Sequence, residues 1–326
     1  MGRNMLVDGE WKTDIEPHTD EDGAFDRVET SFRDWIRDES DARFQPEDDR
    51  YHLYIARNCP WAHGTALTLQ LTGLTDAISI DIVDPWREDD GWKFTPEKNG
   101  CTPDTVSGCE YLREVYVNAD PEFTGRVTVP VLWDKREETI VNNESIEIMR
   151  MFATEFDEYA DGVDLYPEGY RDEIDRIIDD VYDSINNGVY RAGFADSQGA
   201  YDEAVRDVFD GLDHYDEVLA DRRYLAGDRL TLADVRLFPT LIRFDAAYHT
   251  AFKCDKQYLH QYDNLWPYLR DLYQTPGVAE TVVMDHIRDE GYFQGEITSI
   301  GPDLDFEAPH DRDRLPSREP DTRYEQ

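Results

Sequence analysis

The fold is decided by residues 51–63, which read Tyr51-His52-Leu53-Tyr54-Ile55-Ala56-Arg57-Asn58-Cys59-Pro60-Trp61-Ala62-His63. The aromatic and apolar run over 51–56 predicts a β-strand. A helix tolerates proline best in its first turn, so Pro60 predicts a helix start, and the apolar residues that follow carry the helix to Gly73. Cys59 therefore stands between a strand and a helix.

Further elements follow on the C-terminal side of this stretch. Residues 77–83 alternate as a second strand and complete a β-α-β unit. The apolar runs 127–133 and 139–141 predict a hairpin, and a helical pattern starts at 142–145. We expect an α/β domain over 51–160, interrupted by a long connection or insertion at 84–125 whose glycines, prolines and tryptophans give no regular pattern.

The second half of the chain has no strand pattern. Long amphipathic stretches follow one another from about residue 165 to 300 and predict an all-α domain. Within it, Thr231 and Asp234 have the spacing of a helix-capping box. Residues 1–50 are polar and broken up and are expected to form an N-terminal arm, while the charged segment 302–326 is expected to be a flexible tail.

Charge is the most unusual bulk property of the chain. There are 73 acidic and 33 basic side chains, which give a formal net charge of −40. Such a surface repels nucleic acid. The acids are scattered along the whole chain, which predicts adaptation to concentrated salt, because salt screens their mutual repulsion. No apolar run of about 18 residues indicates a membrane span, and we expect no membrane partner.

Cysteine usage indicates the compartment. Four cysteines in 326 residues are few, and the first residues show no apolar export signal, so a cytoplasmic location is expected. Cys101 and Cys109 could form a metal or redox pair, but no further His or Cys stands beside them at the spacing of a zinc site. We therefore expect no metal, and we expect Cys254 to have a structural role.

Cys59 is the candidate nucleophile. The free backbone N–H groups and the dipole of a helix start stabilise a thiolate, which is the reactive form of cysteine. Three residues on stands Ala62 and not a second cysteine, so a resolving thiol has to come from a small molecule such as glutathione. The alternative is that Cys59 is only a small buried apolar residue.

Two further motifs suit a bound thiol tripeptide. A cis peptide at Val129-Pro130 would leave the Val129 backbone able to pair with an extended ligand. Glu144 and Ser145 at a helix start offer a carboxylate for an ammonium group, and N–H groups with a hydroxyl for a carboxylate. The alternative for Glu144-Ser145 is an ordinary N-terminal helix cap.

Several long motifs in order resemble the glutathionyl-hydroquinone reductases, the Xi class of glutathione transferases. The resemblance runs from about residue 25 to 302. The stretches that carry it are 50–54, Cys59-Pro60-Trp61-Ala62-His63, Gly91-Trp92-Lys93-Phe94, 125–135, 139–145, 188–195, Arg243-Phe244-Asp245 and Phe252-Lys253-Cys254. It implies an N-terminal thioredoxin-like α/β domain, an all-α C-terminal domain and a homodimer.

The resemblance also implies a reaction and its residues. The Cys59 thiolate would remove glutathione from a glutathionyl-hydroquinone, and a second glutathione would resolve the mixed disulfide, with no tightly bound cofactor. Matching residues for the hydroquinone site are Tyr190, Tyr248 and Tyr292. Matching residues for the thiol site are Trp92, Arg126, Val129, Glu144 and Ser145.

The chain departs from the family pattern at two places. Gly64 stands where the family commonly has Arg, and the segment from Glu290 toward Pro302 is altered and shortened. The salt-adapted composition also leaves γ-glutamylcysteine as an alternative thiol. A different small-thiol transferase, a dehydroascorbate-type reductase and a non-catalytic binding protein on the same fold are the competing hypotheses.

Overall fold

The computed structural model of the chain describes residues 4–13, 20, 22–25, 29–293, 302 and 304–318. Its internal contacts divide the chain into two compact units. Unit 1 comprises Met1–Pro17, Glu29–Gly162 and Val283–His286. Unit 2 comprises His18–Val28, Val163–Val282 and Ile287–Gln326.

Unit 1 is built on a four-stranded mixed sheet in the order β4-β3-β5-β6. Its strands are β3 Tyr51–Ile55, β4 Ile78–Ile82, β5 Val131–Asp134 and β6 Thr139–Asn142. β3 and β4 run parallel because α1, Pro60–Leu71, crosses between them, whereas β5 runs antiparallel to both of its neighbours. This is the thioredoxin-like arrangement that the sequence predicts.

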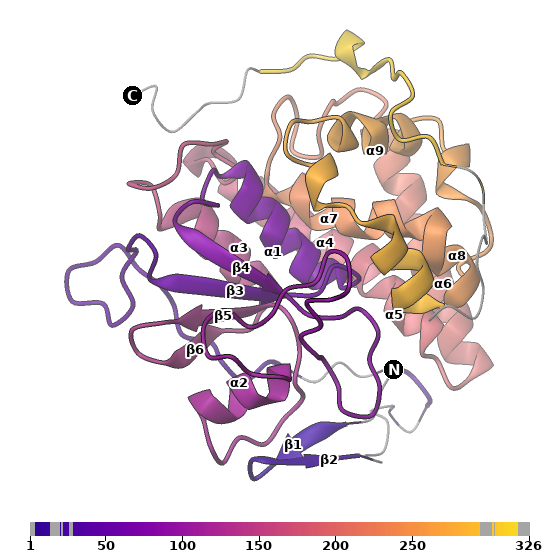
Figure 1. Ribbon diagram of the computed structural model, residues 1–326. Coiled ribbons are helices and arrows are strands. Elements are labelled where there is room, and N and C mark those ends of the chain that lie inside the picture. Colours follow the sequence, from indigo (N-terminus) through magenta and orange to yellow (C-terminus); the bar gives the residue numbers. More distant parts are fainter. Residues whose placement is uncertain are drawn as a thin grey trace. The chain divides into compact units, whose positions relative to one another are not determined.

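Helices cover both faces of this sheet (Figure 1). α1 packs against α3, Ser145–Thr154, and α2, Leu112–Ala119, contacts β6 on the opposite side. All five residues of β3 are buried, as expected of a central strand covered on both faces. α1 is likewise almost entirely buried, which fixes the position of the residue at its N-terminus.

The structure differs from the expectation of an irregular connection over 84–125. This segment contains α2, where Leu112, Val115 and Tyr116 are buried at helical spacing. The loop before α2 is organised by the carboxylate of Asp104, which accepts backbone N–H groups of Val106, Ser107 and Cys109 at 3.0, 3.2 and 2.9 Å. The sequence pattern does not predict this helix, because its apolar positions are few and tryptophans and glycines surround it.

The expected N-terminal arm is more structured than its polar composition indicates. β1, Met5–Val7, and β2, Glu10–Lys12, form an antiparallel hairpin, and Leu6 exchanges backbone hydrogen bonds with Gly125. Ile36 and Phe44 are buried in the core of unit 1. Residues 20 and 22–25 group instead with unit 2, where the rings of Phe25 and Phe194 lie 5.3 Å apart.

Among the described residues of unit 2, the regular elements are helices and helical turns. Its α-helices are α4 Arg171–Val181, α5 Gly188–Gly193, α6 Gln198–Val218, α7 Leu232–Arg243, α8 His249–Ala251 and α9 Leu265–Tyr273. Single 3-10 turns are η1 Glu168–Tyr170, η4 Leu259–Gln261, η5 Ala279–Thr281 and η7 Arg312–Arg314, and π-helical turns are η2 Tyr182–Asn186, η3 Phe244–Tyr248 and η6 His286–Tyr292. Every residue of α7 is buried, so this helix forms the centre of the unit.

The predicted capping box begins α7. Asp234 accepts the backbone N–H of Thr231 at 2.8 Å and its hydroxyl at 3.0 Å. The same carboxyl accepts the Leu225 N–H at 2.9 Å and the Tyr268 hydroxyl at 2.7 Å. A residue predicted as a local cap therefore also joins α7 to a preceding loop and to α9.

The expectation of a flexible tail after residue 302 is wrong for residues 304–318. Arg312 is 1% exposed, and its guanidinium donates hydrogen bonds to the backbone oxygens of Leu219, Arg222 and Arg223. Leu219 is the C-cap residue of α6, where carbonyls lack partners within the helix, and Arg222 and Arg223 lie in the loop that follows. The charged composition of the segment does not predict this interaction.

Candidate functional site

Cys59 occupies the N-cap of α1, with Pro60 in the first turn as the sequence predicts. Its backbone is extended, with φ −78° and ψ 119°, and its carbonyl accepts the N–H of His63 at 2.9 Å. The residue is partly exposed, whereas Ala62 is completely buried. Cys59 is therefore not fully buried, as the alternative interpretation would require. Ala62, which stands where a second cysteine of a Cys-x-x-Cys motif would be, is part of the core.

The cis peptide predicted at Val129-Pro130 is present. Its carbonyl oxygen lies 3.6 Å from the Cys59 sulfur. Val129 precedes the ladder between β3 and β5, which begins at Val131. The backbone at Val129 thus lies beside the thiol and outside the sheet, as an extended ligand would require.

Glu144 and Ser145 begin α3. Glu144 is the N-cap by position, but its side chain makes no capping hydrogen bond to the helix. One carboxylate oxygen instead accepts the hydroxyl of Thr30 at 3.2 Å, and the other lies 3.5 Å from the Ser145 hydroxyl. This geometry argues against the ordinary-cap alternative, because the carboxylate makes no capping hydrogen bond to the backbone N–H groups of α3.

Thr30 contacts the candidate site residue Glu144, and the sequence does not predict this contact. It orients Glu144 from 114 positions earlier in the chain, in a segment without regular structure. No periodicity or spacing connects two such residues. The only available signal is that Thr30 is a polar residue of the arm for which the local sequence shows no turn or capping role.

Trp92 and Arg126 belong to the same unit as Cys59. Trp92 is 6% exposed, the Arg87 guanidinium lies 4.4 Å from its ring centre, and its indole N–H has no hydrogen-bond partner among the described residues. A buried donor without a partner costs free energy, so this N–H is suited to a ligand acceptor. Arg126 is half-buried.

The three candidate tyrosines of unit 2 converge through their hydroxyl groups. The Tyr292 oxygen lies 2.9 Å from that of Tyr190 and 3.0 Å from that of Tyr248. Tyr190 and Tyr248 are buried, and Tyr292 is partly exposed. Although the sequence around Tyr292 departs from the family pattern, this residue is the centre of the cluster. Residues 294–301, the remainder of the altered segment, lie outside the described residues.

π-helical turns are associated with all three tyrosines. Tyr248 ends η3, Tyr292 ends η6, and Tyr190 lies in α5 directly after η2. A π turn rotates the side chains that follow it relative to a regular α-helix, and such turns occur frequently at functional sites. The hydrophobic periodicity of the sequence does not predict these turns.

Burial raises the pKa of the Tyr248 phenol well above its ordinary value, and the neighbouring Tyr190 and Tyr292 add to the effect. The hydroxyl consequently stays protonated throughout the physiological range. A group of this kind can donate a proton, whereas it is not suited to act as a base.

Gly64 has a packing role that explains its size. It lies in α1, where a Cβ atom would come 3.2 Å from the sulfur of Met149 in α3. A longer side chain at this position would require Met149 to move. The departure from the family pattern at Gly64 therefore coincides with close packing between α1 and α3.

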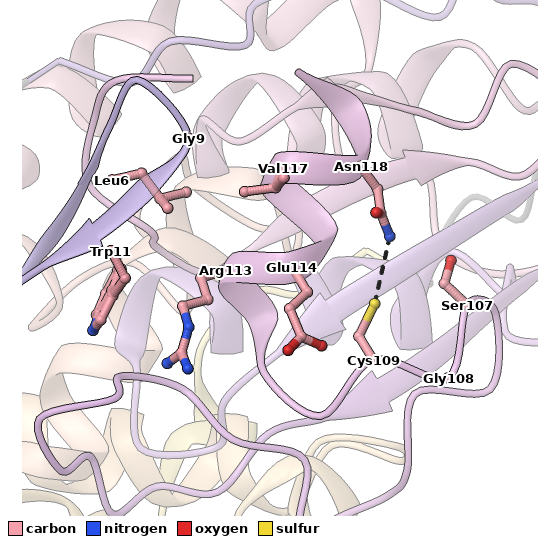
Figure 2. Close-up of a pocket in the computed structure, with 10 residues that line it drawn as sticks. All are labelled: Leu6, Gly9, Trp11, Ser107, Gly108, Cys109, Arg113, Glu114, Val117 and Asn118. Atoms are coloured by element: carbon pink, nitrogen blue, oxygen red, sulfur yellow. Dashed lines mark hydrogen bonds between the residues drawn. The ribbon is translucent and has the colours of Figure 1, made fainter. Parts of the chain in front are cut away.

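Cys101, Cys109 and Cys254 are reduced thiols. No disulfide is formed, and the described residues hold no cluster of three or more His, Cys, Asp or Glu side chains suited to a metal. Cys109 lines a cavity of about 470 Å³ between the β1–β2 hairpin and α2 (Figure 2). Its sulfur accepts the Asn118 amide at 3.5 Å, and burial together with Asp104 raises its pKa to about 12. Cys254 is buried, in agreement with a structural role.

Across the described residues, we find no helix with the length and apolar character needed to span a membrane.

Comparison with known proteins defines the class first. The family model of the glutathione S-transferase N-terminal domain matches residues 58–155, and that of the C-terminal domain matches residues 198–271. The first match includes Cys59, Trp92, Arg126, Val129, Glu144 and Ser145. The second includes Tyr248. The fold is thus that of a glutathione transferase.

Individual relatives define the family more narrowly. "Glutathionyl-hydroquinone reductase YqjG" of Escherichia coli is 47% identical over 95% of this chain and 98% of its own. "Glutathionyl-hydroquinone reductase PcpF" of Sphingobium chlorophenolicum is 44% identical over 91% and 93%. The solved structure "Xi Class GST from Natrialba magadii" is 62% identical, covers 97% of this chain and 98% of its own, and superimposes with a TM-score of 0.90. The chain belongs to the glutathionyl-hydroquinone reductases, the Xi class of glutathione transferases, as its motifs predict.

Proposed function

We propose that this protein removes glutathione from glutathionyl-hydroquinones, with Cys59 as the attacking thiol. The observation that carries the proposal is the position of Cys59 at the N-terminus of α1, with its sulfur 3.6 Å from the Val129 carbonyl beside cis-Pro130. The names of the relatives in Escherichia coli and Sphingobium chlorophenolicum support the substrate class.

The reaction has two sulfur-transfer steps. The Cys59 thiolate attacks the glutathione sulfur, the bond between that sulfur and the aromatic carbon breaks, and the carbon receives the electron pair and a proton. Hydroquinone leaves and a mixed disulfide between Cys59 and glutathione remains. A second glutathione thiolate then attacks this disulfide, which releases glutathione disulfide and restores the Cys59 thiolate. Two glutathione sulfurs are oxidised and one aromatic carbon is reduced, so the electrons balance.

The thiol site is proposed to consist of the five unit 1 residues that resemble the family's glutathione site. Glu144 would pair with the α-ammonium group, and Ser145 with the helix start would bind the α-carboxylate. The Val129 backbone would pair with the cysteinyl residue of the ligand. Trp92 and Arg126 would bind its remaining acceptor groups, with the unpartnered indole N–H of Trp92 as a donor.

The proton for the aromatic carbon is assigned to the tyrosine cluster. Tyr190, Tyr248 and Tyr292 hold their hydroxyls in mutual hydrogen bonds, and the raised pKa of Tyr248 keeps its proton in place. Donation by a correctly placed acid contributes roughly 10²- to 10⁴-fold to a rate. Solvent would return the proton after each turnover.

Glutathione is proposed as a co-substrate and not as a bound cofactor. A solved structure of the Escherichia coli relative has glutathione bound, which supports glutathione as the thiol. γ-Glutamylcysteine is the second candidate thiol, since the proposed contacts of Glu144, Ser145 and Val129 involve only the part that the two thiols share. We further propose that the protein is a homodimer and acts in a reducing cytoplasm, where none of its four cysteines would form a disulfide. Light scattering in molar KCl would test the dimer.

The central experiment compares Cys59→Ser with Cys109→Ser in molar KCl on glutathionyl-menadione. Cys109 is partly exposed like Cys59, so it is a matched control. We expect Cys59→Ser to abolish turnover and the glutathione mass adduct, and Cys109→Ser to retain both. Turnover that survives in Cys59→Ser would refute the proposal. Faster reduction of dehydroascorbate than of glutathionyl-menadione would favour the alternative reductase.

A further inference from the structure

Phe252 contacts all three tyrosines of the cluster. Its ring stacks on Tyr248 at a centroid distance of 5.2 Å and an interplanar angle of 21°. It meets Tyr190 edge-on at 5.1 Å and 68°, and Tyr292 at 5.5 Å and 83°. Phe252 is 6% exposed and has no polar atom in its side chain. One apolar ring therefore contacts each of the three rings whose hydroxyls converge.

The backbone holds Phe252 in this place. Its N–H and that of Cys254 both donate to the carbonyl of Tyr248, at 3.1 and 3.2 Å. Lys253 between them has a positive φ of 57°, and its carbonyl accepts the Tyr201 hydroxyl at 2.5 Å. A non-glycine residue with positive φ is uncommon, so this turn is a specific feature of the chain after α8.

Gly193 provides the space for the ring. A Cβ atom added at this last residue of α5 would overlap the Phe252 ring. The phenyl ring thus lies directly against the backbone of α5, the helix that carries Tyr190. The absence of a side chain at position 193 sets how closely Phe252 approaches Tyr190.

We propose that Phe252 is a positioning residue, which orients the three tyrosine rings so that their hydroxyls meet, and that Gly193 is required for this role. The proposal rests on the proton-donor function given above to the tyrosines. A hydrogen bond between two hydroxyls fixes the separation of the oxygens, but each ring can still rotate about its own bonds. Contacts between ring faces and edges have preferred angles and remove that freedom.

Phe252→Leu tests this role against a matched control. Phe306→Leu removes a similarly buried phenyl ring of the same unit, which packs on Trp266 and Tyr273 and not on the cluster. We expect both variants to lower the thermal midpoint. Only Phe252→Leu should lower kcat, by roughly ten- to a hundredfold, with the KM for glutathione within about twofold. Its kcat should also fall at a lower pH than that of the unmodified protein, because water reaches the phenols. Equal kinetic profiles for the two variants would overturn the proposal.

A double variant separates packing from positioning. Gly193→Ala should lower both the thermal midpoint and kcat, since the new methyl group displaces the ring. Combining Gly193→Ala with Phe252→Leu should restore much of the midpoint but leave kcat at the Phe252→Leu level. Recovery of kcat together with the midpoint would show a packing effect only and would contradict the proposal.

Tyr190→Phe and Tyr248→Phe distinguish this inference from the proposed function. If these variants keep full kcat, the proton-donor function of the tyrosines fails. If they lose activity while Phe252→Leu behaves like Phe306→Leu, only the positioning role of Phe252 fails.

Discussion

The sulfur of Cys59 lies 3.6 Å from the carbonyl oxygen of Val129, a residue 70 positions further along the chain. The contact joins the start of α1 to the cis peptide before β5. A thiol and a backbone segment suited to an extended ligand thus come together only because β3 and β5 are neighbours in the sheet. The proposed reactive atom and part of the proposed binding surface for the thiol therefore depend on this strand pairing for their proximity.

Thiol alkylation should discriminate among the cysteines. Burial raises the pKa of Cys254 to about 12, with a contribution from Asp255, and burial with Asp104 does the same for Cys109. At pH 8 only about one in 10⁴ of such thiols is ionised. Iodoacetamide should therefore label Cys59 before either of them, as read by peptide mass spectrometry. Comparable rates in the folded protein would contradict this, and urea-unfolded protein serves as the control in which all should react.

Glu144→Gln should weaken binding of the thiol. Loss of the carboxylate that is proposed to meet the ammonium group should raise the KM for glutathione by about tenfold and leave kcat nearly unchanged. Glu147→Gln is the matched control, because Glu147 lies in the same helical turn but pairs with Arg33. An equal rise in KM for both variants would assign the effect to the stability of α3 instead of to ligand binding.

The pH dependence of kcat should reflect the buried phenol. The raised pKa of Tyr248 means that its proton is retained at a pH where a solvent-exposed tyrosine, with a pKa of about 10, is half ionised. We expect kcat to show no decline up to about pH 10, measured with circular dichroism as a check that the protein is folded. A decline in kcat centred near pH 10 or lower, in protein that circular dichroism shows to be folded, would mean that the phenol ionises at or below its ordinary pKa and would contradict this prediction.

The same shift has a consequence for stability. A group whose pKa is raised by folding stabilises the protein fully below its unfolded pKa, and this contribution is lost as the pH rises toward its folded pKa. The free energy of unfolding should therefore begin to fall near pH 10 and fall less steeply in Tyr248→Phe. Urea titrations at several pH values measure both slopes, and parallel slopes would refute the assignment.

Asp234→Ala should destabilise unit 2 far more than Thr231→Ala. Removal of the carboxyl leaves the buried donors of Thr231, Leu225 and Tyr268 without their acceptor and should cost about 3 kcal/mol or more. Loss of the Thr231 hydroxyl should cost about 1 kcal/mol. Urea unfolding of both variants gives the comparison, and equal losses would show that Asp234 acts only as a local cap.

Salt should stabilise the protein. With a net charge of −40, self-repulsion is strong in dilute buffer, and raising KCl from about 0.1 M to about 1 M shortens the screening length from roughly 10 to roughly 3 Å. The thermal midpoint should rise by several degrees. Sucrose at the same osmolality is the control for effects that do not depend on charge. A thermal midpoint that is insensitive to KCl would contradict the prediction of salt adaptation.

Local patterns in the sequence predict the elements around Cys59. The run of apolar residues over β3, Pro60 at a helix start and the hairpin residues on either side of 134–138 are local signals, and the structure contains the corresponding elements. Thr231 and Asp234 likewise follow from their spacing. These signals are readable because backbone geometry and side-chain periodicity act within a few neighbouring residues.

Contacts between polar groups that are distant in the sequence depend on the folded chain. Thr30 with Glu144, Arg312 with the end of α6, and Tyr190 with Tyr292 are pairs separated by about 90 positions or more. Their contacts depend on directional hydrogen bonds and on ring packing, and neither leaves a pattern in the local sequence. The family motifs identify the three tyrosines as candidate residues. The proposed positioning roles of Phe252 and Gly193, in contrast, follow only from the packing of the rings.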